Sequence, residues 1–294
     1  MKQLSILCSI FLFLTLASCT SNEGPEYPAK MLPTYIQTQD ANGDNQTFGY
    51  DDRGRIVSWN CISGSPNSTV SYSAHYSYTE GNTIKVRAEE TVNELWEEQH
   101  RVFEETIQLK NGRAAQAEGT FIYTIHSGDG TSEMRKTYRL IFDYLPSNHL
   151  NTVEHFEVYG IVDEIKYNEA WRWKNQLVWE NGNLKEFQDY QGNSTVDTFT
   201  KYEYSADKVA NPLIMPMVTN RAHHLPLLMQ GVFGANSVNL VKSASWLDNK
   251  SNPYLSEEYS YEIENSRISK YTETRFTNFA TTDQVTYTVT WAGE

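Results

Sequence analysis

The sequence predicts an all-β protein, a large antiparallel meander that forms a curved sheet or an open, water-soluble, porin-like barrel. Three observations support this fold class. Apolar and polar side chains alternate along many short runs, as they do in strands with one buried face. Turn dipeptides separate these runs. Aromatic residues, which favour strands, are abundant, with 19 Tyr, 12 Phe and 7 Trp.

The alternation is clearest between residues 71 and 88. Apolar or aromatic side chains occupy every second position of two runs: Tyr72, Ala74, Tyr76 and Tyr78, then Ile84, Val86 and Ala88. Polar residues fill the positions between them. A Glu-Gly-Asn turn at 80–82 separates the two runs, so the segment reads as one hairpin. Similar runs recur to the C-terminus, where Val285, Tyr287, Val289 and Trp291 alternate with threonines.

Asn-Gly dipeptides mark the sharpest turns, at Asn42-Gly43, Asn111-Gly112 and Asn181-Gly182. Both central residues of a type I′ hairpin turn need positive φ, which these residue types tolerate. The spacing of the turns predicts well over a dozen strands, joined mostly to their neighbours in sequence. This arrangement is a meander rather than a βαβ pattern.

Two regions depart from simple alternation. Residues 92–109 place Trp96, Phe103 and Ile107 at near-helical spacing, but the Asn-Gly turn that follows favours a strand. Residues 211–240 contain three prolines, which a central strand does not accept. A short helix from Pro226 to Gly231 fits the second region, and we expect this insertion, near 212–231, to form a plug that covers one end of the sheet.

The N-terminus has the pattern of a secretory signal, with Lys2 followed by an apolar run from Leu4 to Leu16. The run is too short to span a membrane comfortably, which takes roughly 20 apolar residues. The next residues, Leu16-Ala17-Ser18-Cys19, resemble the lipobox of bacterial lipoproteins. We therefore expect a signal peptide at 1–18, a lipidated N-terminus and flexible tether at 19–33, and a single β domain at 34–294.

The lipobox resemblance implies acyl chains, palmitate among them, on Cys19, and two lipid chains are enough for stable anchoring. We expect the protein to lie in the cell envelope, at the outer membrane, with the lipid as its only membrane contact. Cys61 is then the sole thiol of the mature chain. It lies in a strand-like run, so we expect an inert buried thiol with no disulfide.

Removing residues 1–18 takes away one positive charge, Lys2, and moves the formal charge from −13 to −14. A negative domain repels phosphate backbones, which argues against nucleic acid as a partner. Charged residues also occupy the polar faces of the predicted strands, among them Lys85, Arg87 and Glu203. A membrane-spanning strand needs an unbroken apolar face, so we expect a barrel in water.

Several of these features together resemble a family of uncharacterised lipoproteins from Gram-negative gut bacteria, described as a domain of unknown function with a porin-like fold. The resemblance rests on the lipobox, the hairpin Phe48–Ile56, the Asn-Pro-Leu run at 211–213 and the segment 231–240. It spans roughly residues 34–294. The hairpins alone are also similar to the YD-type repeats of bacterial toxins and adhesins. Neither resemblance implies a catalytic residue.

Trp171, Trp173 and Trp179 are the candidate ligand-binding residues, because Trp171 and Trp173 share one face of a predicted strand and exposed rings can stack on sugars. A buried core role is the alternative. The segment Asp40–Asp44 has oxygen ligands at alternate positions, as calcium loops do, but a hairpin turn is favoured. His223-His224 is interpreted as a helix cap or a surface pair, because adjacent residues usually point apart.

The glutamate pairs Glu97-Glu98 and Glu104-Glu105 are interpreted as a solvated face. No catalytic motif, metal site or cofactor is predicted. The sequence therefore favours a non-catalytic binding or accessory module for a glycan, a peptide or a partner protein. The alternative is a structural scaffold for envelope assembly beside an outer-membrane complex. A hydrolase is the third hypothesis, and it would need a cavity lined by converging carboxylates or histidines.

Overall fold

The computed structural model describes residues 32–40, 43–65, 68–79, 82–94, 97–128, 130–161, 165–191, 195–209, 219, 221–277 and 280–293. The signal sequence, residues 19–31 of the predicted tether, including Cys19, and the prolines at 212 and 216 lie outside these residues, whereas Leu32 is buried and Pro33 begins β1. Within them, sixteen strands follow one another along the chain. Their bounds are β1 Pro33–Gln37, β2 Asn45–Tyr50, β3 Ile56–Ser65, β4 Ser68–Thr79, β5 Thr83–Glu94, β6 Glu97–Lys110, β7 Arg113–Ser127, β8 Gly130–Tyr144, β9 Leu150–Ile161, β10 Ile165–Glu180, β11 Asn183–Gln191, β12 Thr195–Tyr204, β13 Val241–Asp248, β14 Pro253–Glu264, β15 Arg267–Thr277 and β16 Ala280–Trp291.

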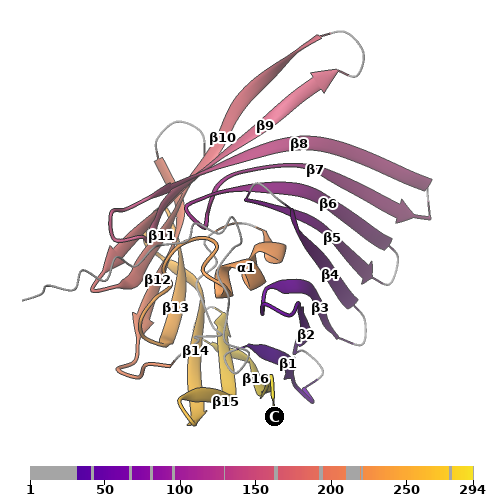
Figure 1. The fold of residues 1–294 in the computed structure, drawn as a ribbon. Coiled ribbons are helices and arrows are strands. Elements are labelled where there is room, and N and C mark those ends of the chain that lie inside the picture. The colour runs from indigo at the N-terminus through magenta and orange to yellow at the C-terminus, as the bar shows by residue number, and fades with distance from the viewer. Residues whose placement is uncertain are drawn as a thin grey trace, which may run out of the picture.

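The strands form a closed barrel in which each strand pairs with its sequence neighbours (Figure 1). The first and last strands complete the ring, since β1 pairs antiparallel with β16 from Pro33 opposite Trp291 to Gln37 opposite Thr288. The predicted meander is confirmed, and the expectation of a curved sheet or an open barrel is corrected to a closed one. Alternation fixes which face of each strand is inside, but it carries no information about whether distant edges meet.

The inside of the barrel is rich in tyrosine. Tyr72, Tyr76, Tyr138, Tyr202, Tyr271 and Tyr287 are all buried in the hydrophobic core. The outer face of the wall carries charged side chains, and Arg87 on β5 pairs there with Glu89 and Glu104 at 2.8 and 2.7 Å. The predicted alternation thus separates an apolar interior from an outer wall that carries charges in mid-strand.

The ambiguous region at 92–109 is strand, as the Asn-Gly turn predicts, because it forms the end of β5 and nearly all of β6. The turn itself has the backbone that a type I′ hairpin requires, with φ of 56° at Asn111 and 75° at Gly112. Trp96, which contributed the helical spacing, lies outside the described residues.

Residues 221–240, which lie between β12 and β13, fold into the barrel, and we call them the plug. It contains a 3₁₀ turn at Ala222–His224 and the helix α1 at Leu225–Met229, with Pro226 in its first turn. The predicted short helix is therefore confirmed. Figure 1 shows α1 enclosed by the strands, so the plug lies inside the barrel as well as across its end.

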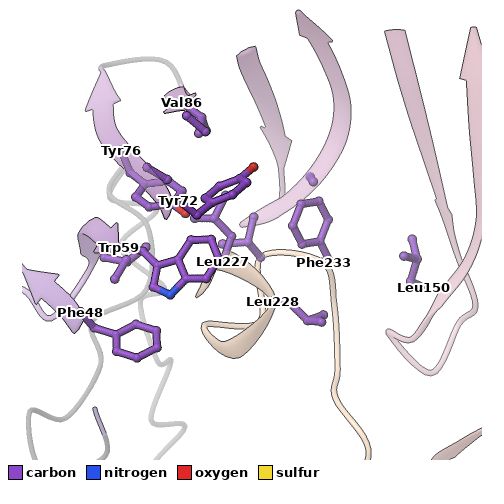
Figure 2. Close-up of a cluster of buried hydrophobic side chains, with 14 of the residues drawn as sticks. Phe48, Trp59, Tyr72, Tyr76, Val86, Leu150, Leu227, Leu228 and Phe233 are labelled. Carbon is purple, nitrogen blue, oxygen red and sulfur yellow. The ribbon is translucent and has the colours of Figure 1, made fainter. Parts of the chain in front are cut away.

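Hydrogen bonds fix the plug to one end of the barrel, which we call the plug end. The side-chain oxygen of Gln230 accepts from the Ile56 amide at 3.0 Å, and its nitrogen donates to the Gly54 carbonyl at 2.7 Å. The Ala114 amide donates to the Val232 carbonyl at 2.8 Å. Figure 2 shows Leu227, Leu228 and Phe233 of the plug packed among wall residues such as Trp59 and Tyr72. The plug therefore completes the core of the barrel.

Candidate functional site

The plug and the barrel wall meet at a buried carboxylate, Glu105 of β6. Its Oε1 atom lies 2.6 Å from Nε2 of His224, and its Oε2 atom lies 3.8 Å from Nε2 of His223. All three residues are at most 3% exposed. Two adjacent plug histidines therefore converge on one wall carboxylate in the middle of the core.

The strand alternation places Glu105 inside the barrel. On β6, Phe103 and Ile107 flank it two residues away on each side, and both are buried. Glu104 points outward, with 56% of its side chain exposed, and pairs with Arg87. The interpretation of Glu104-Glu105 as a solvated face is thus right for Glu104 and wrong for Glu105. A carboxylate between the apolar residues Phe103 and Ile107 on the inner face is the signal that identifies it.

The interpretation of His223-His224 as a surface pair is contradicted, because the two side chains are 0% and 2% exposed. His224 does precede α1, but its side chain makes no capping hydrogen bond. The residues lie in a 3₁₀ turn. Three residues per turn place successive side chains about 120° apart, less than the roughly 180° that separates them on a strand. The rings lie 4.7 Å apart, so both can approach one carboxylate.

Three hydroxyl groups hold this cluster in place. Tyr138 donates to Glu105 Oε2 at 2.8 Å, Tyr72 is hydrogen-bonded to Nδ1 of His223 at 3.1 Å, and Thr219 is hydrogen-bonded to Nδ1 of His224 at 2.9 Å. Gly119 on β7 gives the Tyr138 ring room to reach the carboxylate, since a Cβ atom there would lie 2.6 Å from the Tyr138 hydroxyl. Each ring therefore presents Nε2 to Glu105.

The charges of the cluster follow from burial and pairing. Burial alone would raise the pKa of Glu105, but attraction to His224 and the hydrogen bond with its Nε2 atom hold that pKa well below its ordinary value. Burial lowers the pKa of His223 to about 4 against the opposing effect of Glu105. Glu105 is therefore a carboxylate and His223 a neutral imidazole at pH 7. Nε2 of His223 has no hydrogen-bond partner among the described residues, a state that costs about 1–3 kcal/mol for a buried polar group.

A cavity of about 510 Å³ lies above this cluster, inside the barrel. Arg221, Ala222 and Leu225 of the plug form its floor. Its walls come from the β1–β2 connection and strands β2 to β6 and combine aromatic with polar side chains: Asp44, Gln46, Trp59, Cys61, Ser63, Val70, Tyr72, Glu90, Arg101 and Phe103. The barrel interior is therefore only partly filled, which sequence alternation alone does not reveal.

An ion pair between neighbouring strands β5 and β6 lies on the inner wall of the cavity. Nη1 of Arg101 lies 2.9 Å from Oε2 of Glu90, and 35% of the Arg101 side chain remains exposed, so the cavity is in contact with solvent. Cys61 lines the same cavity and is half-buried. Burial, with a smaller contribution from Asp44, raises the pKa of its thiol to about 12. The thiol is therefore protonated at neutral pH.

The three candidate tryptophans do not form one exposed face. Trp179 is half-buried, and its Nε1 donates to the Leu150 carbonyl at 2.7 Å. Trp173 is also half-buried and stacks on His155 with ring centroids 4.6 Å apart. The register of β10 against β9 shifts between Trp171 and Trp173, so simple alternation does not relate them. The side chain of Trp171 lies outside the described residues. Sugar binding by this group stays a prediction.

The segment Asp40–Asp44 lies in the β1–β2 connection, where the Gly43 amide donates to the Asp40 carbonyl at 3.1 Å. Residues 41 and 42 lie outside the described part. The hydrogen bond is the one that closes a hairpin turn, so this segment fits the turn interpretation.

A third buried histidine, His155 on β9, makes the stability of the barrel depend on pH. Burial lowers the pKa of His155 to about 3, and its Nε2 is hydrogen-bonded to Oδ1 of Asn175 at 2.8 Å. An unfolded histidine titrates near pH 6.5, so between about pH 6.5 and 3 the unfolded chain binds a proton that the folded chain does not. Each unit of falling pH in this window then removes about 1.4 kcal/mol of stability through this residue.

We therefore expect His155→Gln to flatten the pH dependence by about one proton between pH 6 and 4. Urea unfolding followed at a series of pH values measures the slope in both proteins. Titrating groups that do not interact with His155 cancel in the difference, and the interactions of His155 with His224 and Glu105 are smaller than the effect of its burial. Equal slopes in the two proteins would show that His155 is not buried as a neutral imidazole.

The outer wall carries its own groove of about 580 Å³ across strands β4 to β8. Charged and polar side chains line it, including Lys85, Arg87, Glu104 and Glu118. Across the described part of the chain, large hydrophobic residues with high exposure are scattered rather than gathered: Ile62, Met134, Val178, Val238, Tyr254 and Ile263. The described residues also include no helix that is long and apolar enough to cross a membrane.

The fold defines a class: a closed antiparallel barrel of sixteen strands that encloses a plug. Two solved structures are similar to it. A porin-like protein from Bacteroides uniformis matches with a TM-score of 0.53 and 13% identity, over 92% of this chain and 100% of its own. A porin-like protein from Bacteroides vulgatus matches with a TM-score of 0.54 and 13% identity, over 90% of this chain and 100% of its own.

No family model matches the chain, and no curated protein is similar to it in sequence. At 13% identity the two structures show the fold alone, and they confirm the porin-like architecture that the sequence resemblance implies. The signal peptide and lipidation of Cys19 stay predictions.

Proposed function

We propose that the chain is a non-catalytic binding module of the cell envelope, anchored by lipid on Cys19, which takes a small saccharide into the cavity above the plug. The observation that carries the proposal is the cavity itself. Its volume of about 510 Å³ falls within the range of about 300–1,000 Å³ that is usual for small-molecule sites. A cavity of this size suits a short saccharide or the end of a glycan better than a folded partner.

The lining chemistry favours a ligand with many hydroxyl groups. Trp59, Tyr72 and Phe103 supply aromatic surface, and such rings pack against the apolar faces of sugar rings. The polar groups of Gln46, Glu90, Arg101 and Asp44 line the same space and supply donors and acceptors. The ligand site is therefore proposed in the cavity rather than at Trp179, whose indole nitrogen already bonds to the wall.

The charged outer surface of the barrel is consistent with anchoring by lipid alone. Its outward strand faces carry charged pairs such as Arg87 with Glu104, which lipid tails would not accommodate. Lipid on Cys19 would supply the membrane contact, and the barrel would stay in water. A ligand would reach the cavity where the Arg101 side chain, 35% exposed, meets solvent.

The test is a glycan-array screen of the purified full-length chain, followed by calorimetry with the saccharide that binds. Replacing Arg101 with alanine removes a cavity donor, and we expect it to weaken binding at least about tenfold, since hydrogen bonds to charged groups contribute about 1.5–3 kcal/mol. Arg87→Ala is the matched control, because it removes an arginine from an ion pair on the outer wall. Equal losses in both variants, or no ligand on the array, would refute the proposal.

The same experiment tests the absence of catalysis. Asp44 and Glu90 both line the cavity, and glycoside hydrolysis uses two carboxylates. Glu90 is already paired with Arg101, which favours a binding role. Release of reducing ends from the bound saccharide, lost in Glu90→Gln, would instead identify a hydrolase.

A scaffold role in envelope assembly is the second candidate, and the outer groove across β4 to β8 favours it. This groove presents both signs of charge, through Lys85 and Arg87 beside Glu104 and Glu118. Such a surface suits a protein partner rather than a lipid. Cross-linking in intact cells that recovers a membrane protein, and loses it in Arg87→Glu, would favour the scaffold over the saccharide-binding module.

A further inference from the structure

The cluster of Glu105, His223 and His224 has the composition of a metal site. One ligand atom from each residue can be chosen so that all three lie within 4.8 Å of one another. Within the part of the chain that the structure describes, this is the set of histidine, cysteine or acidic residues that meets this condition. Two imidazoles and one carboxylate are the ligands that zinc and its neighbours in the transition series prefer.

The hydroxyl groups that hydrogen-bond to these three side chains also suit a metal site. A ligating histidine normally uses its second ring nitrogen in a hydrogen bond, which fixes the ring and its tautomer. Here Tyr72 and Thr219 hydrogen-bond to the Nδ1 atoms of His223 and His224, so both Nε2 atoms face Glu105. Tyr138 fixes the carboxylate through its Oε2 atom.

An unpartnered atom points to a missing ligand. Nε2 of His223 is fully buried and makes no hydrogen bond within the described residues, although it is directed at Glu105. Ligand atoms of a tetrahedral zinc ion at 2.0–2.1 Å lie about 3.3 Å apart. The distances here, 2.6 Å for His224 and 3.8 Å for His223, lie on either side of that value. A shift of the carboxylate away from His224 and toward His223 would bring both distances toward that value.

We propose that Glu105, His223 and His224 bind a divalent transition-metal ion of the zinc class, which links the plug to the barrel wall. Two ligands come from the plug and one from β6, so the ion would tie segments that are more than a hundred residues apart. The guanidinium of Arg221 lies 4.0 Å from the centroid of the Tyr138 ring. Its positive charge would repel a bound metal ion, so the ion must be held by the three ligands against this repulsion. The site is separate from the proposed saccharide ligand, which requires neither imidazole.

The test uses the full-length chain, stripped with a chelator and titrated with Co²⁺, whose visible absorption reports its coordination. We expect about one equivalent to bind per chain with the spectrum of a four-coordinate site, and Zn²⁺ to displace it. Excess Zn²⁺ at about a hundred times its Kd should also raise Tm by roughly 5 °C.

Glu105→Gln and His223→Gln should weaken Zn²⁺ binding at least about tenfold. Two control variants keep the three ligands. His155→Gln removes a different buried histidine, and His100→Gln removes a half-exposed one that lies 3.9 Å from Glu89. Wild-type affinity in both ligand variants, or loss of binding only in His100→Gln, would refute the site.

Folding of the variants is checked by circular dichroism. If the ligand variants do not fold, X-ray absorption of the zinc-loaded wild-type chain decides the question. Two histidine ligands in the zinc shell support the proposal. A shell with none or one overturns it, as does a stripped wild-type chain that takes up no Co²⁺.

Discussion

Replacing Glu105 with alanine should lower the unfolding free energy of the metal-stripped protein by about 3–5 kcal/mol. The carboxylate is buried at 3% exposure, and it is the shared partner of His224 at 2.6 Å and of the Tyr138 hydroxyl at 2.8 Å. Its removal leaves both groups buried without their acceptor.

Urea unfolding followed by tryptophan fluorescence measures this loss, in a chelator so that no bound ion contributes. Glu104→Ala is the control, because Glu104 is the next residue on the same strand but is 56% exposed and pairs with Arg87 outside the barrel. It should change stability by no more than about 0.5 kcal/mol. Similar losses for the two variants would contradict the interior role of Glu105.

Phe233→Ala should also cost about 3–5 kcal/mol, through a cavity rather than through an unpaired charge. Phe233 is 1% exposed, and its ring centroid lies 5.2 Å from that of Phe142 on the wall and 4.8 Å from that of His224. Figure 2 shows it on the plug, among the side chains of the buried cluster. The barrel around it is closed, so the wall cannot collapse fully onto the space that the ring leaves.

The same unfolding experiment measures this prediction. Val238→Ala is the control within the plug, because Val238 is 47% exposed and its loss leaves no internal cavity. We expect a change of no more than about 0.5 kcal/mol for Val238→Ala. If Phe233→Ala were equally mild, the plug would not be part of the cooperative core.

Much of the wall can be predicted from the sequence because strand pairing between neighbours is local. Alternation at 71–88 correctly predicts that Tyr72 and Tyr76 face inward, and the Asn111-Gly112 turn correctly predicts a strand at 97–110. The short helix at Pro226 follows from proline and glycine positions alone. These features depend on residues only a few positions apart.

The site depends instead on contacts between distant residues, which periodicity does not encode. Glu105 could be placed on the inner face by alternation, but its partner His224 lies 119 positions away in a segment with no strand pattern. The cavity likewise depends on how far the plug enters the barrel. Closure of the barrel also depends on a contact between distant residues. The sequences of β1 and β16 do not differ from those of strands at the edges of an open sheet, so they do not indicate that the two strands pair.

The pairing of β1 with β16 has a consequence for how the protein is made. The barrel closes only when Pro33 pairs with Trp291. The second partner of β1 is therefore missing until β16 has been synthesised and, in an exported chain, translocated. Until then β1 presents an unpaired edge, which is a template for association with other chains. Contacts of such long sequence separation also slow folding. A partly delivered chain is therefore the form most exposed to aggregation, and a chaperone that covers the β1 edge would protect it.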